Sequence, residues 1–521
     1  MPSADVAHNQ FVTPNGFPRP PAIDWSMLWP IVIVITAGVV ALIIEMFRKN
    51  RSNTGIIWTS LLGLGAAAYF VASQFSMPDG ATFANMIVRD RVTLILQLLL
   101  IGICAISFLF SEQYLREKGI AYAEFYQLAL WATAGGMIMV STTNLLILFL
   151  GLEILSIALY VLAGMSRREA RSEESAIKYF LLGAFATGFL LYGIAFIYGG
   201  TGGLDLGQIG KAWASDDPMV RNLLLFGSGL ILIGLCFKAA LVPFHQWTPD
   251  VYQGAPTNVT AFMAAGSKVA AIGALYRVLE GLASMRDFWM PALFGIAIAT
   301  MILGNVVACV QRDVKRTLGY SSIGNAGYLV VALLAHFKAP DKVSLGATLV
   351  FLIAYSVMTL GTFAVVSLST SQGKEGTRFS DLYGLSQRSP FAAALLVVFA
   401  ASLIGVPPTA GFFGKLMIFQ DSLRAGLLPL AIVLALSSII SVYYYLGLVK
   451  AAYTPAEDAM IPGPTRQPNF GLIAATVVCA AAVLAGSMFA EPVIESVQPS
   501  GETIQVHSAP DAVASNPASL R

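Results

Sequence analysis

Repeated apolar stretches of about 20 residues constrain this sequence most, because a helix of that length crosses the hydrocarbon core of a bilayer. About fourteen such stretches can be identified along the chain. The expected spans lie at residues 27–47, 55–76, 92–111, 122–141, 143–164, 176–199, 220–246, 256–280, 289–310, 317–336, 345–369, 390–420, 426–451 and 470–489. The sequence therefore predicts an all-α, polytopic membrane protein.

The composition agrees with this prediction and argues against a soluble enzyme. Hydrophobic residues make up 56% of the 521 residues and charged residues only 12%, about half the charged share of a soluble domain. The cysteines lie far apart in apolar stretches and form no CxxC, zinc or disulfide pattern. The chain also lacks a Gly-rich phosphate loop and the spacings typical of haem or iron–sulfur ligands. We expect no metal and no bound cofactor in this chain, and no nucleic-acid partner.

The ends and loops predict an orientation. Residues 1–26 are polar and Pro-rich without a signal-peptide pattern, and residues 490–521 show no apolar period, so both are expected to be external tails. Loops after the odd-numbered spans carry more Lys and Arg than the opposite side, which places them in the cytoplasm. Residues 203–217 are only partly apolar and are expected to lie along a membrane surface.

Ionisable residues inside the expected spans are the main candidates for function. They are Glu153, Lys178, Lys238, Lys268 and Lys415. A charge at the bilayer centre costs at least about 2.5–3.5 kcal/mol, so each must face protein or trapped water. They could be ion pairs that hold helices together, but one carboxylate cannot neutralise four lysines. A buried lysine can lose its proton and regain it beside a carboxylate, so a proton pathway is the favoured interpretation.

Other polar residues of the spans have simpler explanations. Arg277 and Lys450 lie near span ends and are expected to extend to the interface. Tyr443, Tyr444 and Tyr445 are expected to form part of an interfacial aromatic belt.

Prolines beside two of these lysines predict broken helices. Pro243 follows Lys238, and Pro407 and Pro408 precede Lys415. Interrupted helices in corresponding positions are typical of repeat-built transporters, although a proline kink can also be purely structural. The two breaks lie five spans apart, which predicts inverted five-helix repeats at 122–280 and 289–451, preceded by helices at 27–111 and followed by one at 470–489. His245, next to the first break, could relay protons or be a satisfied structural group.

Three motifs carry a family resemblance. They are LVPFHQWTPDVYQGAPTNVTAFMAAGSKVAA at 241–271, QRDVKRTLGYSSIGNAGYL at 311–329 and GVPPTAGFFGK at 405–415. Together they resemble the antiporter-like subunits of respiratory complex I, over roughly residues 30–490. Among the siblings L, M and N, the form WTPDVYQGAPT, the lysine at 415 and the absence of a lateral helix after the last span are most similar to N.

The resemblance implies roles for the buried charges. Glu153 would pair with Lys238, Lys178 would couple half-channels, Lys268 would be the central relay, and Lys415 would lie nearest the exit.

The resemblance also implies the setting in which this chain works. The chain would be a proton-translocating subunit in a bacterial inner membrane, beside the M, K and J type subunits. NADH, FMN, iron–sulfur clusters and quinone would bind to partner subunits. A multisubunit cation/proton antiporter subunit, a membrane scaffold and the plastoquinone-linked photosynthetic relative remain as alternatives.

Overall fold

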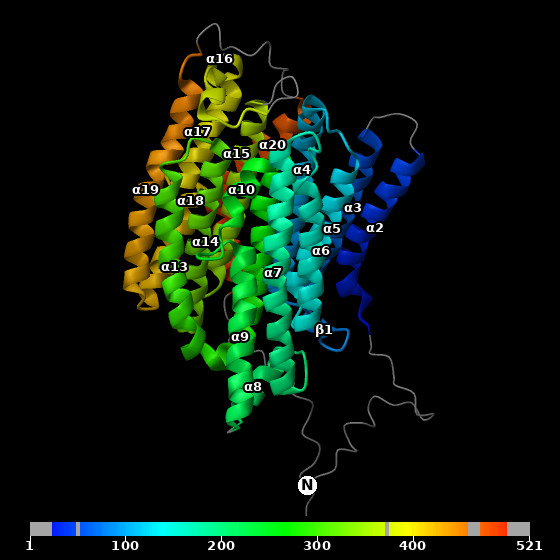
Figure 1. Ribbon diagram of the computed structural model, residues 1–521, viewed down its shortest axis with the longest axis vertical. Coiled ribbons are helices and arrows are strands. Elements are labelled where there is room, and N and C mark those ends of the chain that lie inside the picture. The colour runs from blue at the N-terminus through cyan, green and yellow to red at the C-terminus, as the bar shows by residue number, and fades with distance from the viewer. Residues whose placement is uncertain (1–22, 48–52, 216, 370–374, 457–468, 498–521) are drawn as a thin grey trace, which may run out of the picture.

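The structure is a computed structural model that describes residues 23–47, 53–215, 217–369, 375–456 and 469–497. Within these ranges the chain forms a long bundle of helices with one short antiparallel hairpin (Figure 1). Most of both expected tails, residues 1–22 and 498–521, lies outside the described part.

The elements of the first half lead to the first broken span. They are α2 (Trp25–Phe47), α3 (Thr54–Ser73), β1 (Gly80–Thr82), β2 (Ile87–Arg89), α4 (Arg91–Lys118), α5 (Glu124–Ser141), α6 (Leu145–Ala163), α7 (Ala170–Thr201), α8 (Gly207–Trp213), α9 (Pro218–Ala239) and α10 (Trp247–Gly254). The short helix α8 falls in the segment expected at a membrane surface.

The second half begins with a helix that changes its pitch. It contains α11 (Thr257–Phe262), the π-helical turn η2 (Met263–Ser267), α12 (Lys268–Gly281), α13 (Arg286–Ala308), α14 (Val314–Lys338), α15 (Gly346–Val366), the 3₁₀ turn η5 (Phe379–Leu382), α16 (Leu385–Arg388), α17 (Pro390–Ile404), α18 (Ala410–Arg424), α19 (Leu428–Tyr453) and α20 (Phe470–Ser496).

The lengths of these helices confirm a polytopic helical membrane protein. The described part contains 11 helices long and apolar enough to cross a membrane, or up to 12 if the bent helix α20 counts as one span. The count of fourteen is not confirmed, because α5 and the pair α17–α18 fall outside this set. In α17–α18 the reason is the interruption after Ile404, which leaves two short helices.

Local sequence explains where many helices begin and end. The side chains of Asp90, Asn144 and Asp313 each accept a hydrogen bond from a backbone N–H in the first turn of α4, α6 and α14. These caps satisfy donors that a helix leaves unpaired. At the other end, Gly119 and Gly202 adopt the left-handed conformation that closes α4 and α7.

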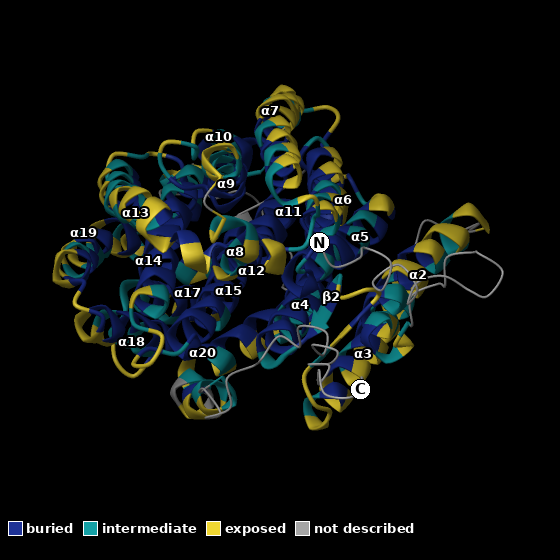
Figure 2. Cartoon of the chain, turned by 90° about the horizontal axis from the view of Figure 1, so that it is seen from below, coloured by how far each residue is buried: buried dark blue, intermediate teal, exposed yellow. Residues whose placement is uncertain are grey.

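Burial is greatest in the middle of the bundle. The most apolar window of the span 257–281 is completely buried, and α14 and α15 are nearly so. Figure 2 shows these helices surrounded by others whose outward faces are exposed, with α2 and α3 forming one edge. A charged side chain on α12 or α14 is therefore far from lipid.

Several span boundaries differ from the sequence prediction. Between the expected spans 220–246 and 256–280, the chain forms the additional helix α10 before it enters α11. Helix α20 continues to Ser496, past the expected end at 489. Both extensions are helices that the apolar-length criterion misses, because polar residues occupy some of their turns.

Candidate functional site

The first broken span places Lys238 in the last turn of α9. The helix ends at Ala239, Ala240 has a left-handed backbone (φ 62°), and residues 241–246, which include Pro243, are not helical before α10 begins. The Lys238 ammonium is buried and donates to Ser156 Oγ at 2.7 Å and to Tyr179 Oη at 3.4 Å. The partners of this ammonium are therefore hydroxyls, not carboxylates.

Glu153 lies on α6, one turn before Ser156. It forms no ion pair with Lys238, and its Oε1 is buried without a hydrogen-bond partner. A cavity of about 10 Å³ lies between Ser156, Lys238 and their neighbours, which is close to the volume that one water needs. Lys238 thus contacts Ser156, one turn after Glu153 on α6, and not Glu153 itself.

Lys178 is not a buried lysine, contrary to its placement among the membrane charges. Its side chain is 43% exposed near the start of α7, and its ammonium pairs with Glu174 at 2.7 Å and with Asp250 of α10 at 2.8 Å. Asp250 also pairs with Arg316 of α14. Helix α7 extends further towards this end of the bundle than the apolar pattern predicts, so Lys178 reaches a polar surface.

Lys268 is the most enclosed of the candidates. The π-helical turn η2 ends just before it, and such turns are frequent at functional sites. Its ammonium donates to the backbone oxygen of Ser322 on α14 at 2.7 Å and lies 5.7 Å from the centre of the Tyr355 ring. Among the described residues, no carboxylate lies within ion-pair distance of it.

In the second broken span, backbone carbonyls at the end of the first half-helix bind the ammonium of Lys415. Helix α17 ends at Gly405 in the left-handed region (φ 94°), and Pro407 and Pro408 lie in the interruption before α18. The Lys415 ammonium donates to the carbonyl oxygens of Leu403 and Ile404 at 2.7 and 3.1 Å. These carbonyls lie at the end of a helix, where the partial charge is negative and favours a cation.

A buried network of hydroxyls and amides occupies the space between Lys268 and Lys415. Tyr445 Oη bonds with Ser321 Oγ next to Ser322, and Tyr444 Oη donates to Asn305 Oδ1. Asn305 donates in turn to the hydroxyl of Tyr328, whose ring lies 5.3 Å from the Lys415 ammonium. The expected interfacial belt is therefore wrong for Tyr444 and Tyr445, which are buried. Only Tyr443 of the three is exposed.

His245 lies in the first interruption, between α9 and α10. It is partly buried, and its Nδ1 has no hydrogen-bond partner. A ring nitrogen without a partner is what a proton relay needs. Within the described residues, no three His, Cys, Asp or Glu side chains converge in the way a metal site requires.

Comparison with known proteins identifies the family. The family model described as "NADH:quinone oxidoreductase/Mrp antiporter, TM" matches residues 142–441. NADH-quinone oxidoreductase subunit N 1 of Herpetosiphon aurantiacus is 41% identical over 455 residues, covering 85% of this chain and 90% of the relative. Subunit N of Chloroflexus aggregans is 38% identical over 487 residues, covering 92% and 97%. The chain belongs to the subunit N family of NADH-quinone oxidoreductase.

Solved structures agree with membership of the subunit N family. A chain of respiratory complex I from Thermus thermophilus matches with a TM-score of 0.74 and 33% identity, covering 90% of this chain and all of that one. The Mrp complex from Dietzia sp. DQ12-45-1b matches with a TM-score of 0.77 but only 20% identity, covering 91% and 95%. The Mrp match shows a shared antiporter-like fold and nothing more.

Two buried charge clusters of this subunit N chain were missed by sequence reasoning. Arg277 does not extend to the interface, because its buried guanidinium holds both carboxylate oxygens of Asp90, at 2.7 and 2.6 Å. Lys118 and Lys315 are buried too, and both pair with Glu375 in the loop after α15. Nothing in the sequence links residues so far apart, so neither pairing could be found from spacing.

Proposed function

We propose that protons cross this subunit through a relay of Glu153, Lys238, Lys268 and Lys415, with Lys178 coupling the relay to its surroundings. The chain is a subunit of the proton-translocating NADH:quinone oxidoreductase, complex I. One observation carries the assignment of the relay. Lys238, Lys268 and Lys415 are buried, and in the described part of the chain each is held by hydroxyl or carbonyl oxygens without a carboxylate in contact.

The contrast with the other buried cations supports this assignment. Arg277, Lys118 and Lys315 each form an ion pair with a carboxylate. A buried lysine with only neutral partners has a weaker hold on its proton, because desolvation favours the uncharged amine. The three unpaired lysines are therefore the groups whose charge can change during turnover.

Buried hydroxyls and amides beside Lys268 and Lys415 support the relay. Ser322, whose carbonyl holds Lys268, also accepts a hydrogen bond on its Oγ from Tyr355. On the far side, Tyr328 links the amide of Asn305 to the ring contact with Lys415. Hydrogen-bonded hydroxyls polarise one another, and in this proposal they line the path of the proton.

The contacts of Lys178 suit it to coupling movements of neighbouring helices, and not to transferring a proton itself. It holds Asp250 on α10, which follows the first interruption, and Asp250 also holds Arg316 on α14. Helix α14 carries the Ser322 carbonyl that holds Lys268. A shift of α10 would therefore be transmitted to the groups around two of the relay lysines. His245 is a candidate for an added relay step at the same interruption.

Close helix approaches support the inverted repeats proposed at 122–280 and 289–451. The first two helices of each repeat, α5–α6 and α13–α14, cross at glycine pairs. A Cβ added at Gly135 would lie 2.7 Å from the backbone oxygen of Gly151, and one at Gly304 would lie 2.5 Å from the backbone nitrogen of Gly324. Small residues let membrane helices approach this closely. Both repeats also contain an interrupted span with a buried lysine beside the break.

The cellular setting belongs to the same proposal. The end of the bundle that carries α16 faces the cytoplasm, and both chain termini are external, in a bacterial inner membrane. The neighbours are the M, K and J type subunits. NADH, FMN, the iron–sulfur clusters and quinone bind elsewhere in the assembly, and their redox energy drives this subunit.

Replacing either end of the first charge pair tests the proposal. We expect Lys238→Ala and Glu153→Ala to assemble into complex I but to lower NADH-driven pumping about tenfold, because the group that accepts or tunes the proton is lost. Pumping is measured by dye quenching in inverted membrane vesicles, and assembly by native gel electrophoresis. Arg221→Ala, an exposed cation near the start of α9, is the matched control. Normal coupled activity in both test variants would refute the relay.

A further inference from the structure

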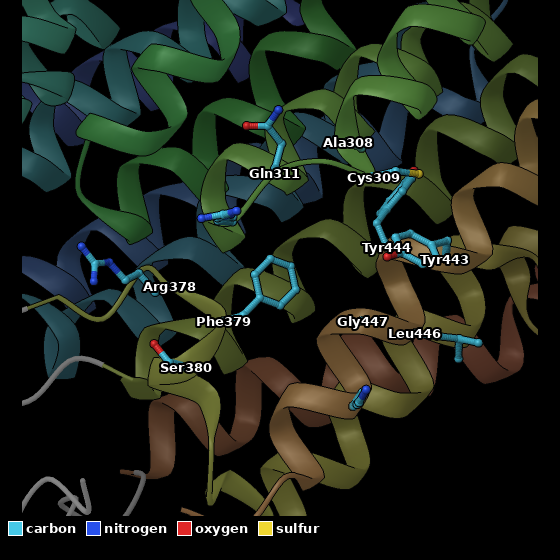
Figure 3. A pocket seen from close by; sticks show the side chains of 12 residues that line it. Ala308, Cys309, Gln311, Arg378, Phe379, Ser380, Tyr443, Tyr444, Leu446 and Gly447 are labelled. Carbon is cyan, nitrogen blue, oxygen red and sulfur yellow. The ribbon is translucent and has the colours of Figure 1, made fainter.

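A cavity of about 700 Å³ opens at the α16 end of the bundle, away from every relay lysine (Figure 3). Its walls come from the end of α13, the turn η5 and the last turns of α19. The lining residues are Ala308, Cys309, Gln311, Arg312, Arg378, Phe379, Ser380, Tyr443, Tyr444, Leu446, Gly447 and Lys450. The volume lies in the range of small-molecule sites in proteins.

The charge of this cavity is entirely positive. Its lining contains Arg312, Arg378 and Lys450 and no carboxylate. All three cations are exposed, and among the described residues none forms an ion pair. The nearby carboxylate of Asp381 accepts from the backbone N–H of Arg378, not from its guanidinium. Three cations from three separate segments thus line one hollow, and no carboxylate is among its lining residues in the described part of the chain.

Below the cavity the surface is apolar. Tyr443 and Leu446 on α19 and Val310 after α13 are 71%, 51% and 73% exposed. Further along the same helices, the apolar surface continues with Ile302, Val306, Ile432, Leu436 and Ile439, all exposed. An apolar stripe on two membrane helices faces acyl chains or a neighbouring helix, and here it leads directly to the basic hollow.

We propose that this cavity binds the headgroup of an anionic phospholipid, whose acyl chains lie along the stripe formed by α13 and α19. The charge pattern favours this occupant: Arg and Lys at a bilayer surface attract anionic headgroups, and basic pockets between membrane helices bind them. Arginine also matches the geometry of a phosphate through two parallel hydrogen bonds. A protein helix from another subunit would bring an apolar face, which would leave the three cations without partners.

A lipid bound in this cavity would lie next to the buried hydrogen-bond network. Tyr444 lines the cavity, and its hydroxyl donates to Asn305 in the buried network. A headgroup held by Arg378, directly before η5, and by Lys450 on α19 would tie these two segments together above Tyr444. The test of this proposal measures lipid binding and not pumping, so it stands or fails independently of the proton-transfer assignment.

The test measures lipid on the assembled complex. Complex I carrying Arg378→Gln and Lys450→Gln is stripped of lipid, incubated with vesicles of phosphatidylglycerol or phosphatidylcholine, and analysed for bound lipid by native mass spectrometry. The matched control removes two exposed cations from the loop before α7, Arg167→Gln and Arg168→Gln. We expect the wild type and the control to prefer phosphatidylglycerol, and the test variant to bind it roughly 30-fold more weakly.

A second variant tests the shape of the site while leaving its charges intact. Gly447→Phe places a ring in the cavity wall and should reduce phosphatidylglycerol retention, even if the double variant fails to assemble. Unchanged phosphatidylglycerol binding in either assembled variant would overturn the proposal. Equal retention of phosphatidylcholine would also overturn it, because the groove would then lack headgroup selectivity. Loss of a neighbouring subunit with unchanged lipid would show that the face is a protein interface instead.

Discussion

Complex I carrying Lys268→Arg or Lys268→Met should assemble normally and pump poorly, with proton translocation reduced about tenfold or more in both variants. Arginine keeps the positive charge but does not release its proton under any physiological condition. Methionine keeps much of the bulk but carries no proton. If Lys268 were only a structural cation, the arginine variant would be nearly normal and the methionine variant would misassemble.

The position of Lys268 deep in the membrane is the basis of this prediction. It lies near the middle of the span 257–281, roughly 18 Å from either end at the rise of an α-helix. Its side chain cannot reach an interface over that distance, and its ammonium is held by the carbonyl oxygen of Ser322. Because no carboxylate depends on this charge, methionine strands no buried partner and removes a desolvation cost. Assembly should therefore survive.

The measurements separate chemistry from folding. Native gels report the amount of assembled complex, and quenching of a pH-sensitive dye in inverted vesicles reports pumping per complex. Lys211→Met, in the exposed helix α8, serves as the control for loss of one lysine. An arginine variant that pumps at the wild-type rate would end the relay assignment for Lys268.

Features set by the bilayer could be predicted from the sequence. Apolar length located the helices, because a span must cover the hydrocarbon core. Prolines marked the interruptions after α9 and α17, since proline removes a backbone donor. The enclosed position of Lys268 followed from its distance to both span ends.

Features set by contacts between distant segments could not be predicted. Arg277 looked like a residue at a span end until the structure placed Asp90 beside it. Tyr445 looked like a belt residue, but the face of α19 that it occupies turns towards Ser321 on α14. Lys178 looked buried because its surroundings are apolar in sequence, yet α7 projects far enough to pair it with Asp250. In each case the surroundings of the side chain depend on how its helix is rotated and on which helices lie beside it. The apolar pattern of a single span specifies neither the rotation nor the neighbours.

The loop glutamate Glu375 is the second residue whose replacement should have a large effect, on stability instead of pumping chemistry. Its carboxylate pairs with Lys118 at the end of α4 and with Lys315 at the start of α14, the latter at 3.0 Å, and also accepts from Thr257 on α11. It therefore joins three helices around two buried ammonium groups. Burial alone would raise the pKa of Glu375, but Lys315 and Lys118 outweigh it and hold the pKa at about 2.

Glu375→Gln should destabilise the subunit by about 3–5 kcal/mol, the cost of removing one partner from a buried ion pair. The buried ammonium of Lys315 loses the most stabilisation, because its remaining partner is the backbone oxygen of Ala255. Lys118 keeps a second carboxylate, that of Glu169 at 2.9 Å. Glu169→Gln is therefore the matched control: it removes a carboxylate from the same cluster but leaves Glu375 in place, and it should cost much less.

The dependence of this effect on pH follows from the depressed pKa of Glu375. A group whose folded pKa is about 2, against 4.5 for the ordinary carboxyl, stabilises the folded state fully above pH 4.5 and loses that contribution as the pH falls through about 2. The ionisation of Glu375 should thus leave the difference in thermal stability between wild type and Glu375→Gln unchanged from about pH 6 to 8 and should shrink that difference only in acid. Thermal stability is measured by heating complex I to graded temperatures and following the loss of the subunit from the complex on native gels. If Glu375→Gln were as stable as Glu169→Gln at neutral pH, the two lysines would not depend on this carboxylate, and the loop would not be what holds α4, α11 and α14 together.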